Sequence, residues 1–255
     1  MEVSGVPTDI VYKKNYLTNV VARIDFISPL QDLNSKLPPE ISKTALINFP
    51  INEPQKVVAR QLQLTSKDFK QKEEEFTQWV FHGKDREKKL WISSSAVFVE
   101  YTKYVNYKGM RDQFIQVLQA LFSVYGDAVC SRIGLRYVNN IVLENGGDPL
   151  SWEDLLHEKL LSVLTFYPEK QYVARSFHNL DLNFSDYNLR YQFGIINPDY
   201  PAAVRQKSFI LDLDAYYQGS LEHNTIEQNL DKFHDRIQEI FELSITTKMR
   251  ELLNA

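Results

Sequence analysis

Two long segments carry apolar residues at helical spacing. The segment 108–125 is followed by Gly126, a residue that commonly ends a helix. The segment 224–243 begins at Asn224, a predicted N-cap, with Glu227 three residues later. The apolar stripe of the first is Met110, Phe114, Val117, Leu118, Leu121, Phe122 and Tyr125, and that of the second is Ile226, Leu230, Phe233, Ile237, Ile240 and Phe241. Both segments are therefore predicted to be amphipathic helices.

Alternating apolar and polar residues predict strands between the helices. The segment 20–27 places Ala22, Ile24 and Phe26 on one face, and 129–143 is a second clear strand. Further strand segments are 56–65, 76–81, 90–101, 171–183, 187–196 and 207–216. Shorter helices are predicted at 39–47 and 151–164, and the charged run 67–75 is predicted to be helical or a solvated loop.

The predicted elements follow the order β-α-β-β-β-α twice. Residues 22–24 (Ala-Arg-Ile) correspond to residues 131–133 (Ser-Arg-Ile), so Arg23 is matched with Arg132. The expected fold is α+β: a duplicated β-α-β-β-β-α unit, with antiparallel sheets and long helices packed on one face. The expected parts are an N-terminal arm (1–16), a first repeat (17–127) and a second repeat (128–255), forming one compact domain. Chance alignment of alternating elements is the competing explanation.

The predicted strands form two antiparallel groups, and the two repeats could join in either of two ways. They could fuse edge to edge, or they could face each other across a cleft. The strand at 129–143 is where the chain passes from one repeat to the other, and no segment rich in Gly, Ser and Pro separates them. The repeats are therefore not expected to behave as independent domains on a linker.

Composition narrows the class of protein. The 255 residues are 44% hydrophobic and 24% charged, which is typical of a globular chain and not of a disordered one. A formal net charge of −4 argues against general nucleic-acid binding. No signal-peptide-like start and no long apolar run are present, so we expect a cytoplasmic protein with no membrane partner.

Familiar catalytic motifs are missing from the sequence. It contains no Walker A loop, dinucleotide-binding glycine motif, H-E-x-x-H or G-x-S-x-G. We expect Cys130 to be a buried small hydrophobe, and the histidines to be solvated or hydrogen-bonded instead of metal ligands. The histidines are His82, His157, His178, His223 and His234. No metal and no cofactor are therefore predicted.

One acidic group offers an enzymatic alternative. Asp212 and Asp214 are two residues apart in a predicted strand, so their carboxylates share a sheet face. Asp181 and Asn183, in a neighbouring predicted strand, could complete a set of oxygen ligands for Mg²⁺. The favoured interpretation is that these side chains lie on a solvated face.

The stretch 132–141 suggests a binding site. Alternation places Arg132 and Arg136 on one face with Gly134 between them, an arrangement suited to a carboxylate or phosphate. Arg23 would contribute from the other repeat, and Asn139 would join only if one residue bulges after Tyr137. The alternative, which we favour, is that the arginines form ion pairs with Asp25, Glu100 or Asp212.

Tyrosines cluster before each predicted long helix. Tyr101, Tyr104 and Tyr107 precede the first, and Tyr216 and Tyr217 precede the second. Such residues commonly anchor protein interfaces, although they are also favourable strand residues.

The sequence R-I-G-L-R-Y-V-N at 132–139 resembles the signature of a sporadically distributed family of uncharacterised bacterial proteins of about 250–280 residues. The resemblance covers the chain in length and in the placement of this strand, and it implies a bacterial cytosolic protein with no assigned reaction. The scattered occurrence of that family suggests a role in defence against mobile elements. The repeated order of elements is also similar to that of bacterial effector-binding domains, which is an analogy of fold alone.

These observations predict a non-catalytic binding or assembly protein that self-associates and binds a protein partner, with an anionic small molecule as another possible ligand. Its predicted binding residues are Arg23, Arg132, Arg136 and Asn139. The alternatives are a domain that senses a small molecule or nucleotide, and a metal-dependent nuclease or phosphotransfer enzyme that uses Asp181, Asp212 and Asp214.

Overall fold

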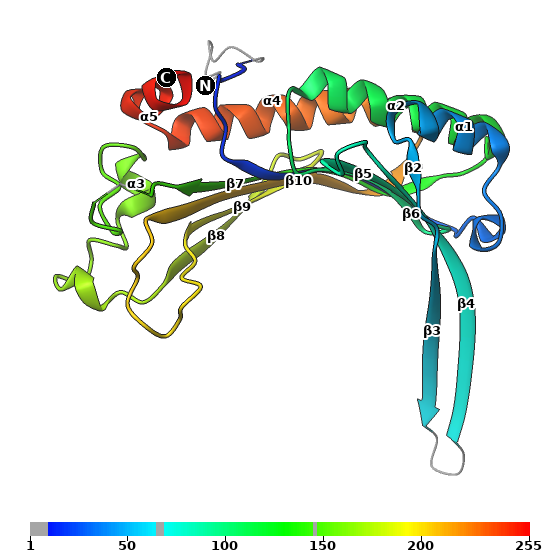
Figure 1. Ribbon diagram of the computed structural model, residues 1–255, viewed down its shortest axis with the longest axis horizontal. Coiled ribbons are helices and arrows are strands. Elements are labelled where there is room, and N and C mark those ends of the chain that lie inside the picture. Colours follow the sequence, from blue (N-terminus) through cyan, green and yellow to red (C-terminus); the bar gives the residue numbers. More distant parts are fainter. Residues whose placement is uncertain (1–9, 65–68, 145–146) are drawn as a thin grey trace.

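A computed structural model describes residues 10–64, 69–144 and 147–255, with the backbone alone for 59–64 and 69–74. Its described part is mixed α+β, with an antiparallel sheet of ten strands and five α-helices (Figure 1). The strands are β1 (Leu17–Phe26), β2 (Ile51–Asn52), β3 (Gln55–Leu64), β4 (Phe69–His82), β5 (Lys88–Ile92), β6 (Ala96–Tyr101), β7 (Cys130–Val142), β8 (Ser176–Asn183), β9 (Asn188–Ile195) and β10 (Ser208–Leu221). The helices are α1 (Pro39–Asn48), α2 (Tyr107–Val124), α3 (Glu158–Leu161), α4 (Ile226–Ser244) and α5 (Thr247–Asn254).

The sheet is continuous across both parts of the chain. Its strand order is β2-β4-β5-β6-β1-β7-β10-β9-β8, with β3 paired to β4 outside this path. The antiparallel ladder between β1 and β7 runs from Leu17↔Asn139 to Phe26↔Cys130 and joins the two groups of strands edge to edge. Of the two expected ways of joining, edge-to-edge fusion is the one observed, because the central strands of the two groups pair with each other.

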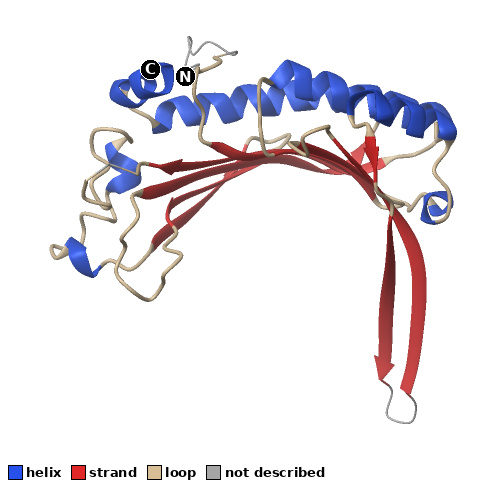
Figure 2. Cartoon of the chain, in the orientation of Figure 1, coloured by secondary structure: helices blue, strands red, loops and turns tan. Residues whose placement is uncertain are grey.

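The two faces of the sheet differ in what covers them. Helices α1, α2, α4 and α5 lie along one side, which we call the covered face (Figures 1 and 2). In β1 the side chains of Ala22, Ile24 and Phe26 point to this side and are buried, as their alternation predicts. The opposite side, called the open face, carries Arg23 and Asp25 in the same strand, and no described helix lies over it.

The two long helices bury the predicted stripes. In α2 the residues Met110, Phe114 and Leu121 are buried, and Asn106 caps the helix by accepting a hydrogen bond from the Gly109 amide at 2.7 Å. In α4 the buried residues include Leu230 and Phe233. None of the described helices combines the length and the apolar character needed to cross a lipid bilayer.

Three local predictions are wrong. Asn224 is not the N-cap of α4: it lies in a 3₁₀ turn, and the helix begins at Ile226 after Thr225, which makes no capping hydrogen bond with its side chain. The charged run 67–75, as far as it is described, belongs to strand β4, where pairing with β3 overrides its helical composition. The segment 151–164 contains only the short helix α3, because its apolar residues pack individually into the core. Trp152 and Leu156 are buried, and Leu156 forms a β-bridge with Ile245 beyond the end of α4.

Strands β3 and β4 form a hairpin that projects from the sheet. In β4, residues 79–82 pair with β5, whereas residues 69–78 pair with β3 alone. Figure 1 shows this hairpin extending away on the side of the open face. We call it the hairpin arm.

Candidate binding surface on the open face of the sheet

The open face brings three of the predicted binding residues together. Arg23 of β1 and Arg132 and Arg136 of β7 all alternate with buried core residues, so their side chains share this face. Arg23 lies directly opposite Gly134 in the β1–β7 ladder, and Arg132 lies opposite Asp25. The sequence therefore predicts both the composition and the location of this arginine cluster.

Asn139 does not belong to the cluster. It is 6% exposed and lies on the covered face, in line with Tyr137 and Ile141. Near Asn139 the irregularity in the ladder falls in β1, between Leu17 and Asn19, so β7 alternates without interruption from Arg132 to Asn139. The prediction that Asn139 shares the arginine face is wrong because the required bulge is on the neighbouring strand.

Gly134 does not leave an empty spot between the arginines. A β-carbon at this position would lie 3.1 Å from both terminal nitrogens of Arg132, so the guanidinium group lies over the glycine. The Arg132 guanidinium carbon also lies 5.4 Å from the ring centre of Tyr216. The absence of a side chain at Gly134 thus accommodates Arg132 itself.

The arginines form ion pairs with carboxylates of the same face. Arg136 makes a bidentate contact with Asp212, with Nε–Oδ1 at 2.8 Å and Nη2–Oδ2 at 2.5 Å. Arg23 contacts Asp25 at 2.6 Å, and Arg132 lies between Asp25 at 3.9 Å and Asp214 at 3.7 Å. The expected pairing with Asp25 and Asp212 is confirmed. Glu100 instead contacts Lys89 at 2.5 Å and Asn19 at 2.7 Å.

Hydrogen bonding and burial change the pKa values of two groups in this network. The hydrogen bonds with Asp212 raise the pKa of Arg136, which stabilises its charged form. Burial raises the pKa of Asp214 above its ordinary value, although the nearby Arg132 and Arg136 guanidinium groups act in the opposite direction. Asp214 is therefore a partly desolvated carboxyl held beside two cations.

The proposed acidic metal ligands are separated by an arginine. Asp212 and Asp214 share the open face as predicted, but Arg190 of β9 pairs in register with both Asp214 and Asp181. Arg190 donates to Asp181 at 3.0 Å, and the Asn183 amide donates to Asn188. Among the described residues, no group of three or more His, Cys, Asp or Glu side chains is placed to hold a metal ion. A cation bridging Asp181 and Asp214 would have to displace the Arg190 side chain.

Aromatic side chains extend the open face toward the hairpin arm. Trp91 of β5 stacks on Phe98 of β6 with ring centres 4.9 Å apart, and the Lys89 amine lies 5.6 Å from the Phe98 ring centre. Sequence reasoning did not select these residues. The signal available in the sequence was that Trp91 and Phe98 alternate with aliphatic residues. The structure shows these aliphatic neighbours to be fully buried, so the two aromatics occupy the solvent-facing positions.

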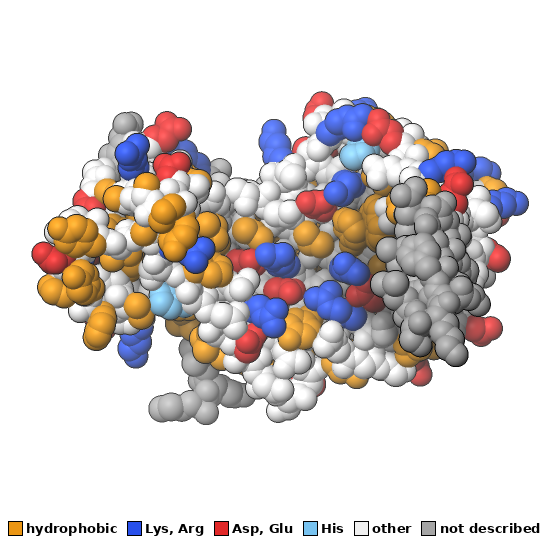
Figure 3. Space-filling view, turned by 90° about the horizontal axis from the view of Figure 1, so that it is seen from below, with side chains coloured by type: hydrophobic (Ala, Val, Ile, Leu, Met, Phe, Trp, Pro, Cys, Tyr) orange, Lys and Arg blue, Asp and Glu red, His pale blue; other side chains and the backbone are white. Residues whose placement is uncertain are grey.

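Figure 3 shows the open face with acidic and basic side chains mixed across its centre. Hydrophobic side chains gather at one end of this view, on the side where Figure 1 places α3. Exposed large residues of the segments next to α3 and between β9 and β10 include Val163, Phe166, Tyr167, Tyr172 and Tyr200. We call these five residues the apolar rim.

The cysteine is buried, and several histidines form hydrogen bonds or stack on aromatic rings. Cys130 is completely buried, and burial raises the pKa of its thiol to about 11. His178 is hydrogen-bonded to Ser176 at 2.9 Å, and His223 stacks on Phe122. His234 is buried and stacks on Tyr107.

A scan against protein-family models and a search of curated proteins each found no match to this chain. The resemblance of residues 132–139 to the uncharacterised bacterial family accordingly stays a prediction.

Proposed function

We propose that this chain is a non-catalytic binding and assembly protein that holds a protein partner against the open face of its sheet. The observation that carries the proposal is the network of arginine–carboxylate pairs and half-buried aromatics along strands that no described helix covers. Arginine and aromatic residues are the types most enriched at protein interfaces. The defence role rests on the sequence resemblance alone, and the cytosolic location rests on that resemblance together with the sequence features described above. Both are part of the same proposal.

The balance of charge favours a protein partner over a nucleic acid. The open-face side chains named above comprise five basic residues, Arg23, Lys89, Arg132, Arg136 and Arg190, and five acidic residues, Asp25, Glu100, Asp181, Asp212 and Asp214. Binding to a phosphate backbone needs an excess of positive charge. A protein surface with its own acidic and basic groups can instead exchange ion-pair partners with this face.

The surroundings of the open face support a partner of some size. The hairpin arm and the segments that carry the apolar rim lie toward opposite ends of the sheet, on the side of the open face (Figure 1). A two-stranded hairpin has little stability by itself in water, and an exposed group of large apolar residues commonly marks an interface. Both features fit a partner that rests on the open face and contacts its two ends.

We also propose that the chain self-associates. Strand β8 ends the sheet, so in the described part of the chain its outer backbone groups have no ladder partner, and Phe177 and Leu180 are exposed on it. Unprotected edge strands pair readily with other chains. Light scattering over a range of concentrations should show a species heavier than 29.8 kDa, and a monomer at all concentrations would contradict this proposal.

We further infer that the two parts of the chain arose by duplication. In the sheet, β1 is followed outward by β6, β5 and β4, and β7 is followed outward by β10, β9 and β8. Ile24 and Ile133, which correspond in the sequence alignment, lie directly opposite each other in the β1–β7 ladder. This register is expected for a twofold axis at that point. Superposing 17–127 on 128–255 should require a rotation near 180°, and a very different rotation would contradict duplication.

Affinity purification from the native host tests the main proposal. The test variant combines Arg23→Glu with Trp91→Ala on the open face, and the control combines Lys43→Glu with Leu46→Ala on α1. We expect a partner in near-stoichiometric amount with the wild type and the control, and its loss with the test variant. Retention of every partner by the test variant would overturn the proposal.

An activity assay separates binding from the enzymatic alternative. Purified protein is incubated with Mg²⁺ or Mn²⁺ and with DNA, RNA or nucleotides, and Asp212→Asn is the matched variant. We expect no turnover, since each carboxylate of the acidic set faces an arginine. Turnover that disappears in Asp212→Asn would establish the enzymatic alternative instead.

A further inference from the structure

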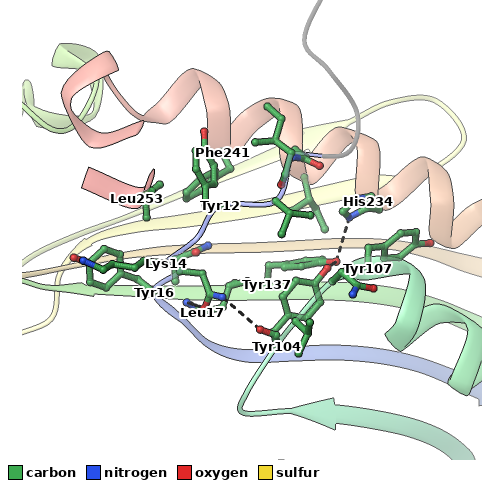
Figure 4. A pocket seen from close by; sticks show the side chains of 18 of the residues that line it. Tyr12, Lys14, Tyr16, Leu17, Tyr104, Tyr107, Tyr137, His234, Phe241 and Leu253 are labelled. Atoms are coloured by element: carbon green, nitrogen blue, oxygen red, sulfur yellow. Dashed lines mark hydrogen bonds between the residues drawn. The ribbon is translucent and has the colours of Figure 1, made fainter. Parts of the chain in front are cut away.

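A pocket of about 100 Å³ lies on the covered side of the sheet. Figure 4 shows that it is enclosed by the chain segment before β1, the loop leading into α2, strand β7 and helix α4. It lies on the other side of the sheet from the arginine cluster. Its walls are mostly apolar and include Tyr12, Tyr104, Tyr107, Tyr137, Ile237 and Phe241.

The segment before β1 is fixed across the pocket. The Gln238 amide donates to the carbonyl of Ile10 at 3.1 Å, and the Tyr12 hydroxyl donates to Glu242 at 2.7 Å. The backbone amide of Lys14 donates to the carbonyl of Leu253 at 2.9 Å. These contacts to α4 and α5 hold one wall of the pocket in place, so the space exists before any ligand binds.

A line of polar atoms borders the pocket. The hydroxyls of Tyr104 and Tyr137 are 3.1 Å apart, and the Tyr137 hydroxyl is 3.1 Å from Nδ1 of His234. His234 in turn stacks on Tyr107, with ring centres 3.9 Å apart and planes 4° from parallel. A phenolic hydroxyl carries one proton and two lone pairs, so it can take part in as many as three hydrogen bonds, and the two contacts of Tyr137 given above are compatible with a third bond to a ligand.

These features define a ligand class. Aromatic walls favour a flat ring, and a volume of about 100 Å³ limits the buried part of a ligand to about one ring. The described lining contains no carboxylate, and its lysine, Lys14, is exposed, so the loss of solvation of a charged ligand could be offset inside the pocket only by the His234 ring. We propose that this pocket binds a small uncharged aromatic molecule with one hydroxyl or ring N–H, of the phenol or indole class.

Calorimetric titration of the full chain with phenol, indole and toluene tests this proposal. Toluene has nearly the shape of phenol but cannot form the hydrogen bond. We expect the wild type to bind phenol about fivefold or more tightly than toluene, as one hydrogen bond predicts. In Tyr137→Phe the ratio should fall toward one while toluene binding is retained. Tyr104→Phe removes the second hydroxyl that borders the pocket, at a less buried residue, and its phenol-to-toluene ratio is measured in the same way.

Tyr191→Phe is the matched control, because Tyr191 is also buried, hydrogen-bonded and on the covered face, but outside the pocket. It should keep the wild-type preference for phenol. The proposal is overturned if neither phenol nor indole binds the wild type at concentrations up to about 10 mM. It is also overturned if phenol and toluene bind equally, or if Tyr191→Phe abolishes the preference as Tyr137→Phe does. If Tyr137→Phe does not fold, the wild-type ratio and Tyr104→Phe decide the outcome.

Discussion

The covered and open faces of β1 and β7 are made by alternate residues of the same two strands, yet they have opposite characters. On the covered face, Ile24, Ile133 and Leu135 are completely buried against the helices. On the open face, Arg23 and Arg136 are each nearly half exposed and are paired with carboxylates. Residues that are neighbours in sequence therefore contribute to different properties of the protein.

The difference has an energetic basis. Burying a large aliphatic side chain contributes about 1.5–3 kcal/mol, whereas an exposed ion pair contributes about 0–1 kcal/mol. Stability should thus depend mainly on the covered face, and the open face should tolerate changes that alter recognition. The following predictions test that division.

The largest effect is expected for Leu135→Ala on the covered face of β7. Leu135 has no exposed surface, so truncation removes apolar burial and leaves a cavity, at a cost of about 2–5 kcal/mol in the free energy of unfolding. Chemical denaturation measures this loss. The control is Val138→Ala on the open face of the same strand, where the side chain is only half buried. Equal losses for the two variants would contradict the division.

A smaller effect is expected from the pair Arg136 and Asp212. The Asp212 side chain is 8% exposed and that of Arg136 is 48% exposed. Arg136→Gln leaves a buried carboxylate without its cation and should cost about 1–2 kcal/mol. Asp212→Asn should cost less, because Arg136 can turn into solvent. Denaturation of both single variants and the double variant measures the coupling, and a larger loss for Asp212→Asn would contradict this asymmetry.

A pH dependence is expected from Asp214. Burial raises its pKa in the folded state above the ordinary value of 3.8, so the folded protein holds this proton more tightly than the unfolded chain. Ionisation of Asp214 therefore lowers the stability of the wild type as the pH rises from 3.8 through the raised pKa. The stability of Asp214→Asn relative to the wild type should increase over this interval. A relative stability that falls or stays constant between about pH 3 and 7 would show that the neighbouring arginines outweigh burial.

The smallest effect on stability is expected for Arg23→Gln. Its ion pair with Asp25 is substantially exposed, so the free energy of unfolding should change by less than about 0.5 kcal/mol. Partner binding should nevertheless weaken in the purification assay. A loss of stability comparable to that of Arg136→Gln would show that Arg23 has a structural role.

The sequence predicts those parts of the molecule in which one face of an element is buried. The apolar stripes of α2 and α4 and the alternation in β1 and β7 are direct consequences of burial, so the helices and the arginine cluster could be located. In the hairpin arm, the strand predicted at 56–65 corresponds to β3, but β4 was not predicted at 67–75. The charged composition of that run favours a helix or a loop, and its strand conformation depends on pairing with β3. The segment 151–164 was mispredicted because capping residues indicate a helix locally, whereas tertiary contacts of Trp152 and Leu156 determine its conformation.

Sequence patterns could not predict the pocket, for a different reason. It is assembled from segments near residues 10–17, 104–107, 137–141 and 234–241, which come together only when the sheet and α4 have formed. Tyr104 and Tyr107 were noticed as part of a tyrosine cluster, but nothing in the sequence connects them with Tyr137 or His234. Such a site can be recognised only from the arrangement of elements in space.

The central position of β1 has a consequence for the synthesis of the chain. Strand β1 leaves the ribosome well before its neighbour β7, which begins only at Cys130, after β2 to β6 and α2 have been made. Until then one edge of β1 carries unsatisfied backbone groups beside strongly apolar side chains, a combination that favours aggregation of nascent chains. The β1–β7 ladder therefore cannot form until translation delivers β7, and the nascent chain carries an unpaired edge of β1 over that interval.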